Sequence, residues 1–439
     1  MDEFRSQVDL VREAFHYQSR FDGSTMVFKI DFPVTEHPLF PSLVKDLALL
    51  SQTGFRVVIV PGAKEWIDAV LGEYKIGSRY NGSTRITSSS AIPFVQMAAF
   101  HCATRFLTGF SGSRVDAIIG NYVRARGLGV INGVDMEHSG TVDKFYIDSL
   151  RRVLDLGTVP IIPCIGWSAS GKPYNVPSDE IAIQAAINLN AVKLFIISLS
   201  GGIKKNNYII PEGIETGENG RIIRLTPQEA HRVLEANSRK SENRELEELA
   251  LAIKASKGGV ERVHIIDGGE EGSVLKELFS NLGSGTMVYA DEYESIRGID
   301  NQDIPDIIRL MEPLMQQGVL IRRTPEDIQN KKSDYAVFVI DGQIHACGAL
   351  HDWGDEQGEI AAIATDPFYT DMGLGRRIIG YLMEKARKSG LKKVFVLTTR
   401  THDWFESLGF RETPLETLPE KKRLVYDHNR NSKVFTREL

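Results

Sequence analysis

The chain has 439 residues, of which 42% are hydrophobic and 25% charged, so disorder over most of its length is excluded. A net charge of −6 argues against a dedicated nucleic-acid-binding protein, whose domains are usually basic. Three cysteines without metal-ligand or CxxC spacing (Cys102, Cys164 and Cys347) exclude a disulfide framework and indicate reduced thiols in a cytoplasmic protein. No apolar run approaches the roughly 20 residues of a membrane span, and residues 1–20 lack the apolar core of a signal peptide.

The first twenty residues have helical spacing. Phe4, Val8, Val11 and Phe15 fall on one face, and acids and arginines occupy most of the rest. An amphipathic helix at a chain end packs either on its own domain or against a partner subunit, and the sequence leaves both interpretations open.

From Thr25 onward, short β-rich runs alternate with longer helical stretches, which predicts an α/β fold with a covered sheet. Most of these runs are continuously apolar, as in strands buried on both faces of a mainly parallel sheet. Strands are predicted at Met26–Ile30, Arg56–Val60, Ala117–Ile119, Val159–Pro163, Leu194–Ser198, Val263–Ile266 and Thr286–Tyr289, and helices at Leu39–Gln52, Asp143–Leu156 and Asp179–Leu189.

A polar tract, Ala290–Ser295, follows the last of these strands and predicts a domain boundary. We therefore assign residues 1–290 to a large first domain and residues 296–439 to a second domain of ordinary size. In the second domain we expect strands at Val319–Arg322, Tyr335–Ile340, Ile344–Asp352, Gly358–Thr365 and Lys393–Thr398, and helices at Asp303–Gln316, Gly375–Ser389 and His402–Ser407.

One loop of the second domain carries a chemical signal. The strand that ends at Thr365 runs into Asp366-Pro367 and then into Gly373-Leu374-Gly375-Arg376, which opens an apolar helix. Backbone N–H groups at a helix amino terminus favour a bound anion, and glycine lets the anion approach the backbone. A Gly-x-Gly pair alone is a weak signal, but the strand before it and the long helix after it favour a pyrophosphate-binding loop.

This loop resembles the acetyl-CoA-binding motif of the GCN5-related acetyltransferase family, with Thr370 where that motif has Gln or Arg. The carboxyl-terminal segments Leu397–Thr401, His402–Phe405, Leu408–Phe410 and Asn429–Val434 resemble the closing segments of the bacterial N-acetylglutamate synthase family. The first domain resembles the amino-acid kinase fold, in the form that this synthase family carries. The segments that match it are Arg56–Ala63, Asn132–Asp135, His138–Gly140, Tyr174–Val176, Val263–Gly268, Leu275–Phe279 and Gly283–Met287.

The resemblance implies that an acetyl group moves from acetyl-CoA to the α-amine of L-glutamate, the first step of arginine biosynthesis. Glu359 matches the position of a general base, acting directly or through one water, and Thr398 would hydrogen-bond the substrate or the departing thiolate. An ordinary strand-edge glutamate and a buried strand threonine are the alternatives. The cofactor contacts implied are the backbone amides of Ile363, Ala364 and Thr365 and the loop residues Asp371, Met372, Gly373, Leu374, Gly375 and Arg376.

L-Glutamate carries two carboxylates, and arginines bind carboxylates in a bidentate way. The residues that match the family's acceptor pocket are Arg323, Arg430 and Ser432. Solvated surface charges are the alternative for both arginines. A pair of arginines favours a diacid over a diamine acceptor such as ornithine.

Active members of the amino-acid kinase family hold ATP phosphates on glycine-rich turns after the first two strands. Here Lys29 keeps the position of the family's lysine, but Asp31 and Phe32 follow where the family has glycines, and the second turn ends at Ala63. An aspartate repels a triphosphate and a phenylalanine fills its space, so we predict no kinase activity. A bifunctional synthase and kinase is the alternative.

In the resembling synthases and in arginine-sensitive kinases, the first domain binds L-arginine beside the amino-terminal helix. Tyr17, His264, Glu277 and Gly283 match that site, although Glu277 is equally consistent with a solvated helix acid and His264 with a capped strand residue. The resemblance also implies a homo-oligomer, a hexamer or a tetramer, without metal, nucleic acid or membrane. A non-catalytic arginine sensor is the remaining alternative, which the intact Gly373-x-Gly375 loop disfavours.

Overall fold

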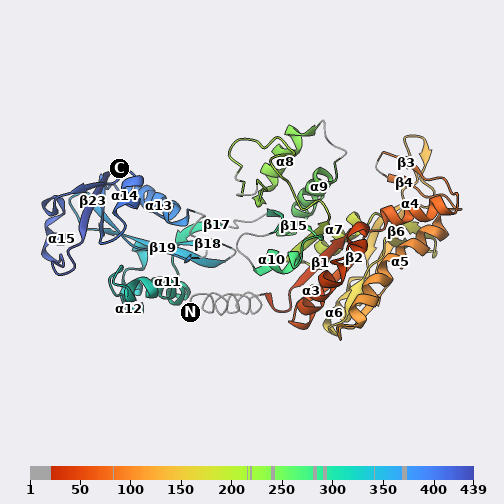
Figure 1. The fold of residues 1–439 in the computed structure, drawn as a ribbon, viewed down its shortest axis with the longest axis horizontal. Helices are drawn as coiled ribbons and strands as arrows, with labels where there is room; N and C mark the ends of the chain where they lie inside the picture. Colours follow the sequence, from red (N-terminus) through yellow and green to blue (C-terminus); the bar gives the residue numbers. More distant parts are fainter. Residues whose placement is uncertain are drawn as a thin grey trace. The chain divides into compact units, whose positions relative to one another are not determined.

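The computed structural model of the chain describes residues 21–82, 84–214, 216–217, 220–238, 243–279, 284–289, 294–340, 342–367 and 373–439. The chain splits into two compact units, Met1–Asp291 and Glu292–Leu439, which are considered separately (Figure 1). The helix predicted for residues 1–20 lies outside the described residues.

The first unit is built on an eight-stranded sheet whose strand order is β14-β16-β15-β13-β1-β2-β10-β5. Neighbouring strands are parallel except for β15 and β16, which are antiparallel. The strands are β1 (Thr25–Ile30), β2 (Arg56–Pro61), β5 (Ala117–Ile119), β10 (Val159–Ile161), β13 (Lys193–Ser198), β14 (Arg224–Leu225), β15 (Arg262–Asp267) and β16 (Thr286–Tyr289). The mainly parallel covered sheet predicted from the continuous apolar runs is confirmed.

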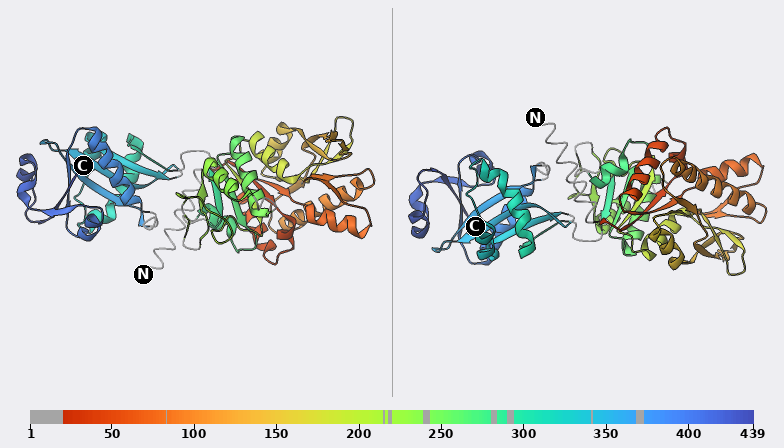
Figure 2. Two further views of the ribbon diagram at one scale, coloured as in Figure 1. Left: turned by 90° about the horizontal axis from the view of Figure 1, so that it is seen from above. Right: turned by 90° about the horizontal axis from the view of Figure 1, so that it is seen from below.

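Helices cover both faces of this sheet (Figure 2). In β1, Met26 and Phe28 belong to the hydrophobic core on one face, which they share with buried residues of α3 (Phe40–Gln52), α5 (Ile92–Ser111) and α10 (Ser273–Phe279). Val27 belongs to the core on the opposite face, which it shares with buried residues of α6 (Ile147–Asp155), α7 (Ser178–Asn188), α8 (Pro227–Ala236) and α9 (Arg244–Lys257). Because both faces of the strand are buried, its sequence is mostly apolar and does not alternate between polar and apolar residues.

Smaller elements complete the first unit. A four-stranded sheet contains β12 (Pro173–Asn175), β11 (Ile165–Trp167), β6 (Val123–Gly127) and β9 (Gly140–Phe145), in that order. Two hairpins pair β3 (Arg79–Asn81) with β4 (Thr84–Ile86) and β7 (Val130–Ile131) with β8 (Val134–Asp135). The short helices α2 (Phe32–Glu36) and α4 (Lys64–Glu73) follow β1 and β2.

The second unit is a seven-stranded sheet with the order β17-β18-β19-β20-β21-β23-β22. Its strands are β17 (Glu294–Gly298), β18 (Tyr335–Ile340), β19 (Gln343–Asp352), β20 (Gln357–Thr365), β21 (Lys393–Thr398), β22 (Arg411–Thr413) and β23 (Lys433–Glu438). The long helix α13 (Leu374–Lys388) packs on one face. The helices α11 (Ile304–Gln316) and α12 (Pro325–Asn330) pack on the other, and α14 (His402–Ser407) and α15 (Glu420–Leu424) flank β22 in the chain.

The parallel strands β20 and β21 separate in the middle of this sheet. Their ladder covers only Gln357–Glu359 against Lys393–Phe395, while β20 continues to Thr365 and β21 to Thr398. A register shift between β19 and β20 leaves Ala362 at φ +54°, a left-handed conformation that is rare outside glycine. The bulge bends β20 away from β21 and opens a gap between their carboxyl ends.

Three expected elements differ from the structure. The strand predicted at Val319–Arg322 is wrong: Gly318 ends α11 at φ +70°, and the N–H groups of Val319 and Leu320 donate to the Leu314 carbonyl instead of to a sheet. The helix predicted from Asp143 begins only at Ile147, because residues 140–145 form β9. Glu294 and Ser295, which were predicted to belong to a polar linker, begin the edge strand β17. Edge strands often carry charged residues, so the polar composition did not indicate a strand.

Candidate functional site

The predicted pyrophosphate loop ends at the amino terminus of α13. Gly373, the N-cap residue, has φ +64° and ψ +24°, a left-handed conformation that glycine adopts without strain. Gly375 is buried in the first turn, where an added Cβ would lie 3.0 Å from Cζ2 of Trp404 and 3.6 Å from the Thr365 methyl group. A residue with a side chain is therefore disfavoured at both positions, by backbone conformation at Gly373 and by close packing at Gly375.

The described first turn of α13 carries Arg376 and Arg377, both exposed, and no acidic residue. The helix dipole favours the reverse arrangement, with acids in the first turn. Arg377 also places its guanidinium carbon 4.6 Å from the centre of the Phe338 ring. An anion at this helix end would meet both the backbone N–H groups and the charge of Arg376. Asp371 and Met372, predicted for the same loop, lie outside the described residues.

Ile363, Ala364 and Thr365 lie at the end of β20, beside the gap between β20 and β21. The Asp366 N–H donates to the His345 carbonyl of β19 at 2.8 Å. Successive N–H groups of a strand point to opposite edges, so those of Ile363 and Thr365 point away from β19, toward the gap. The Ala364 N–H points toward β19. Two of the three predicted amides thus face the gap.

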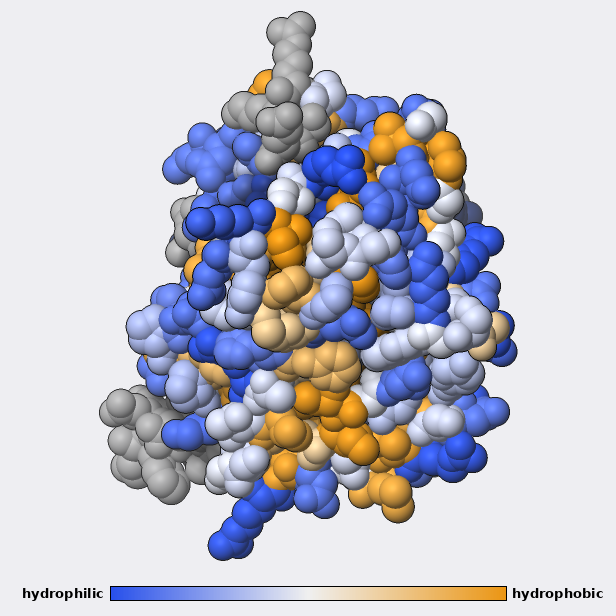
Figure 3. All heavy atoms as spheres, turned by 90° about the vertical axis from the view of Figure 1, so that its right-hand side faces the viewer, coloured by the Kyte–Doolittle hydropathy of each residue, from blue (hydrophilic) through white to orange (hydrophobic). Residues whose placement is uncertain are grey.

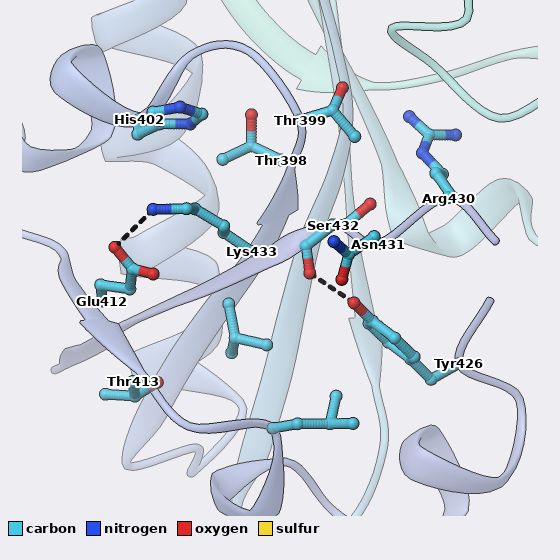
Figure 4. Close-up of a pocket in the computed structure, with 12 residues that line it drawn as sticks. Thr398, Thr399, His402, Glu412, Thr413, Tyr426, Arg430, Asn431, Ser432 and Lys433 are labelled. Atoms are coloured by element: carbon cyan, nitrogen blue, oxygen red, sulfur yellow. Dashed lines mark hydrogen bonds and ion pairs between the residues drawn. The ribbon is translucent and has the colours of Figure 1, made fainter. Parts of the chain in front are cut away.

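A cavity of about 580 Å³ lies at the carboxyl end of β21 and brings together Thr398, Arg430 and Ser432 (Figure 4). Tyr426 donates its hydroxyl proton to the Ser432 carbonyl at 2.6 Å, which holds the segment after α15 against the start of β23. The other residues that line the cavity are Thr399, His402, Glu412, Thr413, Leu415, Tyr426, Asn431, Lys433 and Val434. Residues from two distant segments, which the sequence predicts to act together, therefore share one cavity.

The positive charges of the two predicted acceptor arginines influence each other. The half-buried guanidinium of Arg430 donates to the Val319 carbonyl, in the segment between α11 and α12 that also contains Arg323. Burial and the positive charge of Arg323 lower the pKa of Arg430. Arg323 itself lies outside the set of described residues that line the cavity. An anionic ligand at Arg430 would offset this repulsion.

Thr398 caps the turn into α14. Its Oγ accepts the N–H groups of Arg400 at 3.3 Å and Thr401 at 3.1 Å, and it lies 2.8 Å from the Thr401 hydroxyl. The two accepted hydrogen bonds occupy both lone pairs of the Thr398 hydroxyl, so it takes part in a further hydrogen bond only as a donor. Thr398 is therefore placed to donate, either to Thr401 or to a ligand in the cavity.

Glu359 is buried at the last position where β20 pairs with β21. Nζ of Lys422 lies 2.9 Å from its Oε1 and 2.7 Å from its Oε2, and Nε1 of Trp353 donates to Oε2 at 2.8 Å. Glu359 lies outside the set of described residues that line the cavity. Neither Trp353 nor Lys422 is among the residues singled out from the sequence. Lys422 lies in the charged run Glu420–Arg423, where nothing distinguishes a buried lysine from a solvated one.

In the first unit, the turn after β1 is filled by a network of charges. Lys29, only 1% exposed, pairs with Asp31 and lies 2.8 Å from Oδ1 of Asp179. Arg244, the first residue of α9, places its guanidinium 2.8 Å from Asp31 and 3.1 Å from Glu248. The carboxylate of Asp31 therefore lies between two cations.

The pKa values of this network agree with its geometry. Burial by itself lowers the pKa of Lys29, but the carboxylates of Asp179 and Asp31 outweigh burial and raise it. Burial opposes ionisation of Asp179 too, yet Lys29 and Arg244 lower its pKa. Glu248 is the exception, because burial dominates and raises its pKa. Lys29 and Asp179 are thus held as charged, mutually neutralised groups.

His264 and Glu277 from the predicted arginine site are in contact. Nδ1 of His264 lies 2.6 Å from Oε1 of Glu277, whose Oε2 accepts the N–H groups of Ser284 at 2.5 Å and Gly285 at 3.1 Å. Burial and the Lys193 ammonium lower the pKa of His264 to about 4. Despite burial, hydrogen bonds from His264 and from the backbone lower the pKa of Glu277. Tyr17 and Gly283 lie outside the described residues.

Other ligand types find little support. Within the described ranges, no group of three His, Cys, Asp or Glu side chains is arranged to hold a metal ion. No helix among the described residues combines the length and apolar character needed to cross a membrane. Cys102, Cys164 and Cys347 are buried free thiols.

The chain is similar to known acetyltransferases over nearly its whole length. The amino-acid acetyltransferase of Salmonella typhimurium is 34% identical over 444 residues, which cover 98% of each chain. The chain belongs to the amino-acid acetyltransferase family. The Amino acid kinase family matches residues 23–267, and the Acetyltransferase (GNAT) family matches residues 304–410.

Two solved structures resemble this acetyltransferase as a whole. N-acetylglutamate synthase from Neisseria gonorrhoeae in complex with coenzyme A and L-arginine is 33% identical, with a TM-score of 0.83 over 98% of this chain and 99% of that one. The same synthase in complex with coenzyme A and N-acetyl-glutamate is 34% identical, with a TM-score of 0.61 over the same shares. The fold and the enzyme class inferred from the sequence are confirmed: an amino-acid kinase fold precedes an acetyltransferase unit in one enzyme.

Proposed function

We propose that this enzyme is an N-acetylglutamate synthase, which transfers the acetyl group of acetyl-CoA to the α-amine of L-glutamate. The observation that carries the proposal is the cavity where Arg430 and Ser432 meet Thr398, with the positive charge of Arg323 acting on Arg430. Two guanidiniums suit an acceptor with two carboxylates. The similar Neisseria synthase is solved with N-acetyl-glutamate and coenzyme A, which supports the same acceptor here.

The amino terminus of α13 suits the pyrophosphate of acetyl-CoA. Gly373 and Gly375 keep the backbone accessible, and the first turn carries Arg376 where an acid is expected. This arrangement favours a bound anion through both the helix dipole and a side-chain charge. The gap between β20 and β21 lies directly before this loop in the chain, which suits the thioester end of the same molecule.

Three groups of the chain have roles in the transfer. Glu359 accepts the proton that the α-ammonium of L-glutamate must lose before it attacks, directly or through one water. The N–H groups of Ile363 and Thr365, which point into the gap, stabilise the oxyanion and hold the pantetheine. Thr398 donates its hydroxyl proton to the substrate or to the departing thiolate.

Acetyl transfer measured over the common amino acids, with and without L-arginine, tests this proposal. We expect release of coenzyme A with L-glutamate at rates well above those with the other amino acids. Ornithine or another diamine as the preferred acceptor would contradict the assignment of the two arginines. No transfer to any amino acid would instead favour a non-catalytic sensor.

We further propose that L-arginine binds the first unit at His264 and Glu277 and regulates the enzyme. The similar synthase that is solved with L-arginine supports this, as does a buried carboxylate suited to a guanidinium. Millimolar L-arginine is expected to change the transfer rate and raise the thermal midpoint of the wild-type enzyme. Glu277→Gln should lose both responses, and a response equal to wild type would remove Glu277 from the site.

The kinase-like unit is proposed to have no kinase activity. Asp31 lies where an ATP phosphate would need to approach, and both cations nearby are already neutralised. The added Cβ of any residue replacing Gly62 would lie 3.1 Å from Asp31, so this turn is closely packed. ATP turnover that depends on N-acetylglutamate would overturn the proposal and establish a bifunctional enzyme.

A homo-oligomer, a hexamer or a tetramer, in the cytoplasm completes the proposal. Figure 3 shows apolar side chains gathered in a patch on one face of the molecule. Exposed apolar residues of the first unit include Met97 and Phe100 on α5. The buried free thiols suit a reducing compartment. Light scattering after size-exclusion chromatography gives the number of subunits, and a monomer at all concentrations would contradict the proposal.

A further inference from the structure

We propose that Lys422 is a positioning residue for acetyl transfer, which fixes the carboxylate of Glu359 in one orientation and leaves one lone pair of its Oε1 open to take a proton from the acceptor. The inference rests on the proposed function, because it takes Glu359 as the general base. It adds a residue from α15 that contacts the base and the ring of Trp353.

The hydrogen bonds of Glu359 identify the oxygen that is able to act. An ionised carboxylate offers about four lone-pair sites, two on each oxygen. Lys422 and Trp353 occupy both sites on Oε2, at 2.7 and 2.8 Å, and Lys422 occupies one on Oε1, at 2.9 Å. Among the interactions of the described residues, one lone pair on Oε1 is left. A proton from the amine, or from one bridging water, goes to that site.

Stability alone does not explain the position of Lys422. It is the one side chain of α15 that is buried, and Lys421, Arg423 and Leu424 beside it are exposed. Burying an ammonium is costly even when it is paired, and a well-packed apolar side chain at such a site is often equally stable. The Trp353 ring offsets part of that cost, since its centre lies 4.6 Å from Nζ. The chain thus keeps a buried charge next to the proposed base.

The charges around Glu359 come from two directions. Lys422 contacts it from α15, and His351 lies directly opposite it on β19. Nδ1 of His351 is 2.6 Å from a carboxylate oxygen of Asp334. The residue opposite on β21 is Phe395, which does not titrate. Lys422 is therefore the cation in direct contact with the base.

The step has to account for two protons, because the nitrogen of the α-ammonium becomes an amide that carries one hydrogen. Oε1 of Glu359 takes the first proton, which frees the nitrogen lone pair to form a bond to the acetyl carbon. The carbon–sulfur bond breaks with its electron pair on sulfur, the second proton of the nitrogen goes to that sulfur, and coenzyme A leaves as a thiol. Glu359 then releases its proton to solvent.

The test compares Lys422→Met, Lys422→Arg and the control Lys421→Met in the full-length enzyme, with coenzyme A release from acetyl-CoA and L-glutamate as the readout. In Lys422→Met we expect kcat to fall about ten- to a hundredfold near pH 7, with the KM of L-glutamate within about threefold of wild type. Lys422→Arg should bring kcat back to within about threefold of wild type, because a guanidinium is also able to donate to both carboxylate oxygens. Lys421→Met should match wild type.

The outcomes separate this inference from the function on which it rests. If wild type does not acetylate L-glutamate, the proposed function fails. If wild type is active and Lys422→Met keeps its kcat, the inference alone fails. A rise in the KM of L-glutamate as large as the fall in kcat would mean that Lys422 only holds α15 in place, and would also overturn it. Should Lys422→Met not fold, Trp353→Phe removes one donor to Oε2 and should lower kcat by a smaller factor.

Discussion

Two turns of the chain follow a sheet strand and are built like anion sites. They differ in whether a carboxylate of the chain itself already pairs with the cations. After β1 in the first unit, the cations Lys29 and Arg244 are neutralised by Asp31, a carboxylate of the chain itself. After β20 in the second unit, Gly373 and Gly375 leave the helix end open, and Arg376 is exposed beside it. A cluster of basic residues after a strand is therefore insufficient to define a phosphate site. What decides is whether the protein supplies the anion itself.

Replacing Asp31 is expected to have the largest effect. Asp31→Asn leaves Lys29 and Arg244 buried with fewer partners, which should lower the free energy of unfolding by about 3 kcal/mol. Calorimetry of the full chain measures the loss, and the exposed Asp116→Asn should stay within about 0.5 kcal/mol of wild type.

The variant Asp31→Asn also tests whether the turn after β1 is built like the anion site after β20. If Asp31 replaces a phosphate, millimolar inorganic phosphate should raise the melting temperature of Asp31→Asn and leave wild type unchanged. Equal phosphate responses in the two proteins would show that the turn was never an anion site.

A second buried charge pair makes the first unit sensitive to acid. The pKa of His264 is lowered to about 4 by burial and Lys193, whereas its ordinary value is 6.5. Between these values the unfolded chain binds a proton that the folded chain does not. The free energy of unfolding therefore falls as pH drops from about 6.5 to 4, by at most about 1.4 kcal/mol per pH unit. The lowered pKa of Glu277 extends the loss to lower pH.

Urea midpoints measured from pH 7.5 to 4.5 test this pH dependence. His264→Gln should flatten the slope, while His231→Gln, at an exposed position of α8, should keep it. An unchanged slope in His264→Gln would mean that His264 is protonated in the folded state.

In the second unit, the two arginines should affect the acceptor and not the cofactor. Arg430→Ala removes a charged hydrogen-bond donor from the cavity, which should raise the KM of L-glutamate about ten- to a hundredfold. The KM of acetyl-CoA should stay within about threefold, because the pyrophosphate loop is untouched. Steady-state kinetics provide both constants, with exposed Arg423→Ala as the control. If neither Arg323→Ala nor Arg430→Ala changes the KM, both residues leave the proposed site.

The smallest effect is expected at the glycine that keeps the second turn open. Gly375→Ala places a Cβ 3.0 Å from Trp404, whereas Gly380, farther along the same helix, has no atom within 4 Å of that position. Gly380→Ala should stabilise α13 by up to about 1 kcal/mol, and overpacking should cancel that gain at Gly375. Thermal midpoints of the two variants measure the difference. A gain at Gly375 equal to that at Gly380 would contradict close packing against Trp404.

The sequence was sufficient where a residue's neighbours are local or fixed by a regular sheet. The buried strand at Met26–Ile30 was predicted from its apolar run, and Gly373 and Gly375 from their place at the amino terminus of a long helix. Contacts between residues far apart in the chain could not be predicted from the sequence. Arg244 contacts Asp31, which is 213 positions away, and Lys422 contacts Glu359, which is 63 positions away. In both pairs one partner was singled out and the other belonged to a charged run, where composition predicts solvation. Only packing decides which member of such a run turns inward.

The network around Asp31 also constrains how this sequence is able to evolve. Reopening the turn by one substitution leaves buried cations without a counter-charge, so the first step is destabilising whatever it later permits. Removing Arg244 first leaves Asp31 and Glu248 with one fewer counter-charge. The effects of these positions are therefore strongly non-additive, and the favourable combinations are separated by unfavourable single steps. Such epistasis means that selection on stability alone is enough to keep the carboxylate in this turn.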